Sequence, residues 1–371
     1  MRTDLFLRII RAGLWEDIES ERGTLPEISA DEWNTFYSLA SEQTVAGLFA
    51  AGIEALGLNP SKEVSLKLLG REVSLEKSNS AMNSFIAVLF ARLHEEGIRA
   101  VLVKGQGIAR CYVRPQWRAP GDVDLLLDDA NYSAAKTLLM PRASKVEEEF
   151  PRHKHLGMFF GKFEVELHGT MYTLLSRRMD GKIAEYQDEM FRSGSFDAWN
   201  DDGTEVPLPD ADTDVVFIFT HILQHFFKEG IGLRQFCDWA RLLWTKRASI
   251  DWDLLSRRME EMGIMKEWKA FIAFAVEYLG LPVEAAPMYD ASARWKRKAA
   301  RILRYVLSTG NFGSARGFND KKGSLLFSKI AGFFILVSDF FRCYLITFPA
   351  DSLRFFAYSA GVSLSNFIHG K

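Results

Sequence analysis

Apolar residues recur every three or four positions along most of this chain, which is the spacing of amphipathic helices. The pattern holds over residues 5–93 and predicts a helical N-terminal region with a break at Asn59 and Pro60. It returns after Met171, beyond a polar, proline-containing stretch at residues 193–212, and predicts helices that continue toward the C-terminus. Helices are therefore expected on both sides of a central region.

The central region, residues 96–172, has a different pattern. Short apolar or alternating runs bounded by glycine and proline predict strands, and these runs read RAVLV, VDLLL, LGMFF and FEVELH. Pro115 and Pro120 leave room for only a short helix between the first two runs. The pattern therefore predicts an α+β fold, with a helical N-terminal region at 1–95, an α+β core at 96–172 and a helical C-terminal domain at 173–371.

The composition is that of an ordinary folded protein, with 371 residues, 48% hydrophobic and 25% charged. Lysine and arginine number 46 against 48 acidic residues, so the net charge of −2 creates no basic field for nucleic acid or anionic lipid. A basic helix at residues 294–304 is a local exception, and a solvated or membrane-facing surface is its simpler interpretation. Three widely separated cysteines fit a reducing compartment, so we expect a cytoplasmic protein.

The most hydrophobic segment lies at residues 324–348. Lys329, Asp339 and Arg342 interrupt it, so we do not expect it to span a membrane. Two interpretations stay open, a buried helix of the C-terminal domain or a phenylalanine-rich helix in contact with a membrane surface. The residues before it, 313–324, predict a flexible loop.

Candidate chemistry centres on the run that begins GDVDLL at residue 121. Successive side chains of a strand alternate, so Asp122 and Asp124 face one side while Val123 and Leu125 enter the core. Adjacent carboxylates repel each other unless a cation lies between them. Hard oxygen ligands at this spacing suit Mg²⁺ or Mn²⁺, so the pair predicts a metal site.

The run FEVELH repeats this arrangement about 40 residues later. Glu164, Glu166 and His168 share one strand face, and the apolar residues between them share the other. A third carboxylate, either Glu164 or Glu166, would complete a set able to hold metal ions across a triphosphate. That arrangement is suited to nucleotidyl transfer.

A glycine-containing turn directly after the first predicted strand is suited to phosphate. Lys104 adds a positive charge, and Gly105 and Gly107 expose backbone N–H groups. The turn is not a dinucleotide-binding fingerprint, because Arg110 stands where the third glycine of G-x-G-x-x-G belongs. The sequence G-x-x-x-x-G-K-[ST] is absent from the chain, so a P-loop is not supported.

Together these motifs resemble an uncharacterised bacterial nucleotidyltransferase family with a DNA-polymerase-β-like core. The resemblance extends to about residue 245 and rests on Lys104, Gly105, Tyr112, Pro115, Arg118, Gly121, Asp122, Asp124, Glu166, His168, His221, His225, Arg234 and Asp238. It implies a small mixed sheet, metal-binding acids at Asp122, Asp124 and Glu166, and a triphosphate held at the Gly105 turn. One departure is the Lys104-Gly105 pair, where the wider superfamily has Gly-Ser.

Two pairs of polar residues in the C-terminal helices are each spaced four apart. His221 and His225 lack the glutamate of the zinc-protease motif H-E-x-x-H, because Ile222 stands there. They are expected either to line an interhelical contact or to touch a substrate. For Arg234 and Asp238 the default is an intrahelical ion pair, although Arg234 is the preferred phosphate contact if these helices close over the nucleotide.

These observations predict a metal-dependent nucleotidyltransferase that moves a nucleoside monophosphate from an NTP to an unidentified acceptor and releases pyrophosphate. The expected cofactor is Mg²⁺ or Mn²⁺, and the expected nucleotide-binding residues are Lys104, Gly105, Gly107, Arg118 and Arg234. The unusual Lys104-Gly105 turn leaves open an alternative, a non-catalytic nucleotide-binding or interaction protein. Contact of the C-terminal helices with a membrane surface is a further option.

Overall fold

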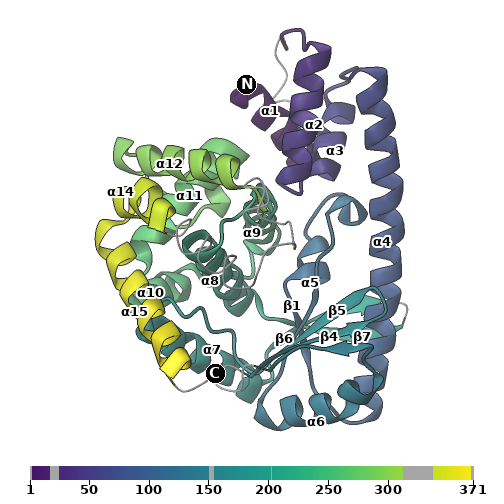
Figure 1. Cartoon of the computed structure of the whole chain (residues 1–371), viewed down its shortest axis with the longest axis vertical. Coiled ribbons are helices and arrows are strands. Elements are labelled where there is room, and N and C mark those ends of the chain that lie inside the picture. Colours follow the sequence, from purple (N-terminus) through teal and green to yellow (C-terminus); the bar gives the residue numbers. More distant parts are fainter. Residues whose placement is uncertain (1, 17–24, 150–153, 202, 312–336, 369–371) are drawn as a thin grey trace.

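The computed structural model describes residues 2–16, 25–149, 154–201, 203–311 and 337–368. Helices at the two ends of the chain flank a small mixed sheet, which lies beside the long helix α4 (Lys62–Glu95) in Figure 1. The predicted α+β fold class is confirmed. The termini of the described chain lie at opposite ends of this view, with the helices of the C-terminal region between them.

The described part of the N-terminal region contains four helices, as the apolar spacing predicts: α1 (Thr3–Trp15), α2 (Ala30–Glu42), α3 (Ala46–Ala55) and α4. Ser29 begins α2 with a capping box, in which its side chain and that of Glu32 satisfy each other's backbone N–H groups. The predicted break at Asn59 and Pro60 separates α3 from α4, and Ser61 caps the start of α4.

Among the described residues, the central sheet has five strands in the order β1-β2-β5-β4-β3. Its strands are β1 (Val101–Val103), β2 (Val123–Leu126), β3 (Lys145–Val146), β4 (His155–Phe160) and β5 (Phe163–His168). β2 and β5 are parallel, whereas the other neighbours are antiparallel. Between the strands lie the short helix α5 (Gly105–Ala109), the 3-10 turns Pro115–Trp117 and Met140–Arg142, and α6 (Asp129–Leu139).

The two faces of β2 and β5 divide as their alternation predicts. Val123, Leu125, Val165 and Leu167 are buried in one cluster with residues of α4 and α6. Asp124, Glu166 and His168 point to the opposite face. Burial of the apolar face fixes the register of the strands, and the register brings the polar side chains together.

The polar stretch at residues 193–212 differs from expectation because it contains a β-hairpin. β6 (Phe196–Asp201) and β7 (Thr204–Pro209) pair in antiparallel fashion around Gly203, which has a φ of 79°. Trp199, Val206 and Leu208 pack into the cluster beneath the sheet. The region from residue 173, which was predicted to be helical, therefore contains a pair of strands that packs on the same side of the molecule as the sheet. Helices follow this pair along the chain.

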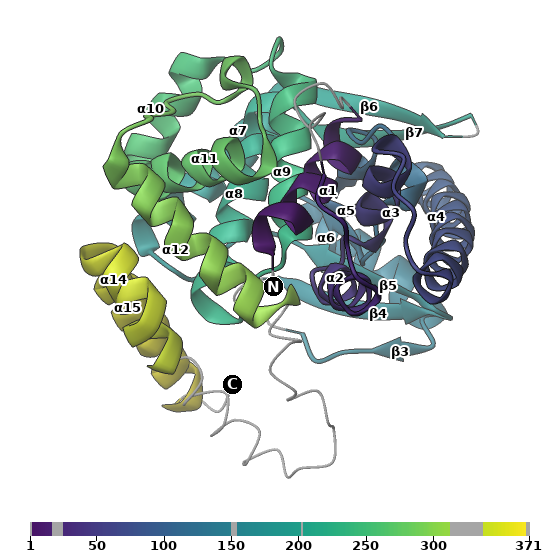
Figure 2. The ribbon, with the colours of Figure 1, turned by 90° about the horizontal axis from the view of Figure 1, so that it is seen from above.

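The other elements that the structure describes in the C-terminal region are helices. These are α7 (Arg177–Ser193), α8 (Ala211–Lys228), α9 (Leu233–Lys246), α10 (Trp252–Met262), α11 (Met265–Leu279), the 3-10 turn Val283–Ala285, α12 (Ala293–Thr309), a π-helical turn (Phe340–Tyr344), α14 (Leu345–Thr347) and α15 (Pro349–Ile368). Figure 2 shows α1 lying between α3 and the C-terminal helices. Phe6 and Phe49 belong to the same hydrophobic cluster as Trp239 and Trp268, so the two predicted helical regions share one core.

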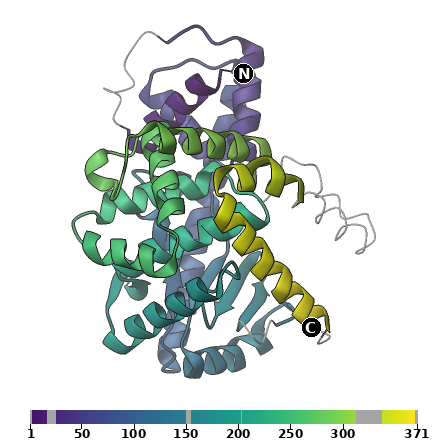
Figure 3. The same cartoon turned by 90° about the vertical axis from the view of Figure 1, so that its left-hand side faces the viewer.

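The C-terminal helices α14 and α15 cross the outer side of this helical layer (Figure 3). The predicted flexible loop at 313–324 and the first part of the hydrophobic segment lie outside the described residues. Within the described ranges, no helix is both long and apolar enough to cross a membrane. Phe341, Ile346 and Leu353 are exposed there, and contact with a membrane surface stays a prediction.

A buried carboxyl group on α11 makes the stability of the fold depend on pH. Burial, with the nearby charge of Asp351, raises the pKa of Glu267 to about 8. The folded chain therefore retains a proton that the unfolded chain releases near its ordinary pKa. The contribution of Glu267 to the free energy of unfolding is therefore fully present below its ordinary pKa and is lost as the pH rises to about 8.

We therefore expect the unfolding free energy of the wild type to fall with pH between pH 5 and 8, by up to about 1.4 kcal/mol per pH unit from Glu267. Glu267→Gln should remove this contribution to the slope. Urea unfolding at pH 5, 6.5 and 8 measures this change. Glu277→Gln on the same helix is the matched control. Although burial acts in the opposite direction, hydrogen bonds from Lys296 and Tyr289 lower the pKa of Glu277. Equal pH slopes for the wild type and Glu267→Gln would contradict the prediction.

Candidate functional site

The site begins at the turn between β1 and α5. Lys104 and Gly105 both have positive φ, at 58° and 42°, and this conformation reverses the chain immediately after the strand. A β-carbon on Gly105 would lie 3.1 Å from the carbonyl oxygen of Asp122. Glycine therefore fits both the backbone conformation and the close approach of the segment that leads into β2.

The three predicted metal-binding acids lie around one pocket. Asp124 is directly opposite Glu166 in the parallel β2–β5 pairing, and Asp122 immediately precedes β2. Lys104 lies against these acids, with its Nζ 2.6 Å from Oδ1 of Asp124. The structure thus brings together four residues that are up to 62 positions apart in the sequence, from 104 to 166.

Two histidines also contact the acids. Nε2 of His168 lies 2.8 Å from Oδ1 of Asp124 and 3.3 Å from Oε2 of Glu166. Nε2 of His155, on β4, lies 3.2 Å from the same Glu166 oxygen. Through these contacts His168 can orient the carboxylate of Glu166.

The charges of these groups depend strongly on one another. Burial, followed by repulsion from Asp124 and Glu166, raises the pKa of Asp122. Burial acts in the same direction on Glu166, but hydrogen bonds from His155 and His168 outweigh it and lower the pKa of Glu166. Burial opposes protonation of Lys104, yet attraction from Asp124 and Glu166 raises its pKa. Acids held this closely favour a cation between them.

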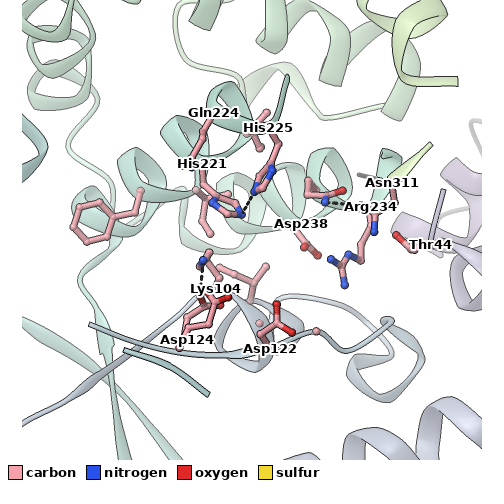
Figure 4. Close-up of a pocket in the computed structure, with 18 of the residues that line it drawn as sticks. Thr44, Lys104, Asp122, Asp124, His221, Gln224, His225, Arg234, Asp238 and Asn311 are labelled. Carbon is pink, nitrogen blue, oxygen red and sulfur yellow. Dashed lines mark hydrogen bonds and ion pairs between the residues drawn. The ribbon is translucent and has the colours of Figure 1, made fainter. Parts of the chain in front are cut away.

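Helices α8 and α9 face these acids across the pocket (Figure 4). His221 and His225 lie on α8, and their Nε2 atoms are 3.1 Å apart. Nδ1 of His225 lies 3.2 Å from Oε2 of Glu229. Burial, with the positive charge of Lys104, lowers the pKa of His221 well below its usual value. Both histidines line the pocket, and their contact with a substrate stays a prediction.

The ion pair expected within α9 is replaced by a longer-range one. Asp238 accepts hydrogen bonds of 2.8 Å from both Nε and Nη2 of Arg118, and Tyr112 donates one of 2.6 Å to the same carboxylate. The intrahelical Arg234–Asp238 prediction was therefore wrong, because the planar guanidinium of Arg118 offers a buried, bidentate partner. Arg118 lines the pocket, but its guanidinium is directed to Asp238.

Arg234 enters the pocket from the first turn of α9. Its Nη1 donates to the carbonyl oxygen of Ala119 at 2.9 Å, and its guanidinium lies against Gly121. Its Nε is buried and has no hydrogen-bond partner among the described residues. Burial, followed by repulsion from Arg118, lowers the pKa of Arg234. The side chain is thus a half-buried cation beside Asp122.

The pocket that these residues enclose has a volume of about 880 Å³. Of the predicted nucleotide-binding residues, Lys104, Gly105, Arg118 and Arg234 line it. Gly107 does not belong to this lining within the described part of the chain. A β-carbon on Gly107 would instead meet the side chain of Leu208 on β7 at 3.1 Å, so this glycine serves packing.

Several lining residues escaped prediction from the sequence. Arg71, Ser74 and Ser78 are contributed by α4, and their spacing of three and four places them on one face of that helix. Thr44 and Asn311 come from distant segments, and the sequence contains no local signal for either. His155 faces His168 only through the β4–β5 register, which follows from the hairpin around Gly161.

Comparisons with known proteins point to one family. A family model described as "Uncharacterised nucleotidyltransferase" matches residues 29–280, a span that contains the sheet, the acids and α8 to α11. A solved structure of an antigenic nucleotidyltransferase-like protein from Paracoccidioides brasiliensis is similar over 57% of this chain and 94% of that chain, at 13% identity and a TM-score of 0.34. No curated protein matches the sequence.

Proposed function

Because the chain belongs to the uncharacterised nucleotidyltransferase family, we propose that it transfers a nucleoside monophosphate from an NTP to an acceptor and releases pyrophosphate. The observation that carries this proposal is the convergence of Asp122, Asp124 and Glu166 in a pocket that also contains Lys104 and Arg234. Such a pocket combines a site for divalent metal with cations for a polyphosphate chain.

The donor atoms of the site fit Mg²⁺ or Mn²⁺. Oxygen ligands on neighbouring strand positions suit hard cations, and the raised pKa of Asp122 reflects repulsion that a cation would relieve. When bound, the metal would polarise the phosphate and increase the acidity of an acceptor hydroxyl. Asp122, Asp124 and Glu166 would hold it, and Lys104 would exchange its contact with Asp124 for one with the triphosphate.

Arg234 is the proposed phosphate contact on the opposite wall. It is half-buried, it lines the pocket that contains the acids, and its buried Nε has no partner among the described residues. A phosphate oxygen would supply both the missing hydrogen-bond acceptor and a counter-charge. His221, which burial helps to keep neutral, is placed on the same wall and can accept a hydrogen bond from the acceptor.

We expect Arg234→Gln to weaken NTP binding about 10- to 100-fold, since hydrogen bonds to charged groups each contribute about 1.5–3 kcal/mol. Isothermal titration of the variant with the preferred NTP in the presence of Mg²⁺ measures the loss. Arg247 is exposed at the C-terminal cap of α9. Arg247→Gln is therefore the matched control and should bind NTP like the wild type. Unchanged affinity in Arg234→Gln would remove this residue from the nucleotide site.

The proposed function is tested by titrating the purified chain with all four NTPs, with and without Mg²⁺, and by assaying pyrophosphate release with a broad acceptor panel. Metal-dependent binding together with pyrophosphate release supports transfer. Binding without pyrophosphate release across the panel would favour the non-catalytic alternative. The Lys104–Asp124 ion pair is the observation that favours that alternative, because it neutralises one of the acids that a metal requires.

A further inference from the structure

Histidine side chains gather beside the acids on β4 and β5. His155 and His168 are directly opposite each other in the antiparallel β4–β5 pairing, and Glu166 lies two residues before His168 on the same strand face. Directly opposed residues of neighbouring strands have close β-carbons, so their side chains extend together. The ring centres of the two histidines are 4.9 Å apart.

Three potential ligand atoms converge there. Nε2 of His155 and Nε2 of His168 lie 3.2 and 3.3 Å from the same carboxylate oxygen of Glu166, and the ligand atoms of the three residues lie within 4.8 Å of one another. A tetrahedral ion with ligands at about 2.0–2.1 Å separates neighbouring ligand atoms by about 3.3–3.4 Å. Two of the three separations, those between the Glu166 oxygen and each histidine nitrogen, already match the spacing that such an ion requires.

We propose that His155, Glu166 and His168 bind a divalent transition-metal ion such as Zn²⁺. Imidazole nitrogen is a good ligand for Zn²⁺ and Co²⁺, whereas Mg²⁺ prefers oxygen ligands in an octahedral arrangement. Oδ1 of Asp124 lies 2.8 Å from Nε2 of His168, so a further carboxylate is adjacent. The site shares Glu166 with the proposed nucleotide site, but its binding of metal does not depend on nucleotidyl transfer.

The geometry distinguishes this cluster from the histidine pair on α8. Nε2 of His221 and Nε2 of His225 are 3.1 Å apart, but Glu229 contacts His225 through Nδ1, on the other side of the ring. These three groups form a chain of contacts, while His155, Glu166 and His168 gather around one point. His221→Gln is therefore the variant that separates the two histidine clusters in an experiment.

The test uses Co²⁺ as a spectroscopic probe for the full chain after metal removal by chelation and dialysis. We expect the chain to bind one equivalent of Co²⁺ with visible absorption. Zn²⁺ should displace this ion, whereas excess Mg²⁺ should not. His155→Gln should weaken binding at least about tenfold, because even residues outside the ligand shell commonly contribute that much. The exposed His94→Gln is the matched control and should bind like the wild type.

The proposal is overturned if the wild type gives no Co²⁺ spectrum, if Mg²⁺ displaces the ion at equal concentration, or if binding is lost in His221→Gln and retained in His155→Gln. Circular dichroism confirms that each variant is folded. Failure of the proposed function can be distinguished from failure of this metal site. In the first case pyrophosphate release is absent while the Co²⁺ titration is unaffected. Loss of Co²⁺ binding with intact NTP·Mg²⁺ binding rejects only this inference.

Discussion

Asp122→Asn and Asp124→Asn are each expected to lower pyrophosphate release by at least about a thousandfold. Metal coordination contributes several kcal/mol of transition-state stabilisation, and each 1.4 kcal/mol corresponds to a factor of about ten. An amide keeps the size of the carboxylate but carries no charge, so metal binding is weakened while side-chain packing is retained. Steady-state pyrophosphate release at saturating NTP and Mg²⁺ measures the effect.

The two variants are expected to differ in stability. Burial and repulsion from Asp124 and Glu166 raise the pKa of Asp122, so its replacement by asparagine should leave the urea midpoint unchanged or higher. Asp124→Asn removes the partner of Lys104 and should lower the midpoint. The exposed Asp188→Asn on α7 is the matched control for both measurements. Full turnover in both variants would refute the assignment of these acids.

Asp238→Ala should destabilise the fold by about 3–5 kcal/mol, the usual cost of leaving a buried charge unpaired. The carboxylate accepts two hydrogen bonds from Arg118 and one from Tyr112, and all three side chains are buried. Although burial acts against ionisation, attraction from Arg118 lowers the pKa of Asp238, so the pair is charged at neutral pH. Urea unfolding of the wild type and the variant measures the loss.

Two further variants show whether the buried charge causes this loss. Arg118→Met/Asp238→Leu removes both charges and should recover much of the stability, since apolar side chains can replace a buried ion pair. Lys67→Gln removes one partner of the exposed Lys67–Glu63 pair on α4 and should leave the stability almost unchanged. Equal losses in Asp238→Ala and Lys67→Gln would contradict the explanation.

Local periodicity was sufficient to predict β1, β2, β4 and β5 and the facing of the acids on β2 and β5. The alternation at Asp122 and Asp124, and again at Glu164 to His168, predicts a polar face opposite a buried one, and the structure has both. This works because burial of one strand face determines the direction of every side chain along that strand. The identity of the bound metal and nucleotide stays a prediction.

The pairings between distant elements could not be predicted in this way. The spacing of Arg234 and Asp238 favours an intrahelical pair, but Arg118, 120 positions from Asp238, offers a better geometry. The β6–β7 hairpin was missed because its prolines and acids are typical of loops. Its strands are stabilised by the burial of Trp199 and Val206 against other elements. Tertiary contacts therefore decided both cases.

Helix α4 makes formation of the pocket depend on the folding of two hydrophobic cores. Val64 and Leu68, near its start, belong to the core of the helical layer, while Ile86 and Phe90, near its end, belong to the core beneath the sheet. Arg71, Ser74 and Ser78, which line the pocket, lie between these anchors. If only one of the two cores were folded, this part of α4 would not be held against the acids. The pocket can therefore enclose a ligand only when both cores are folded.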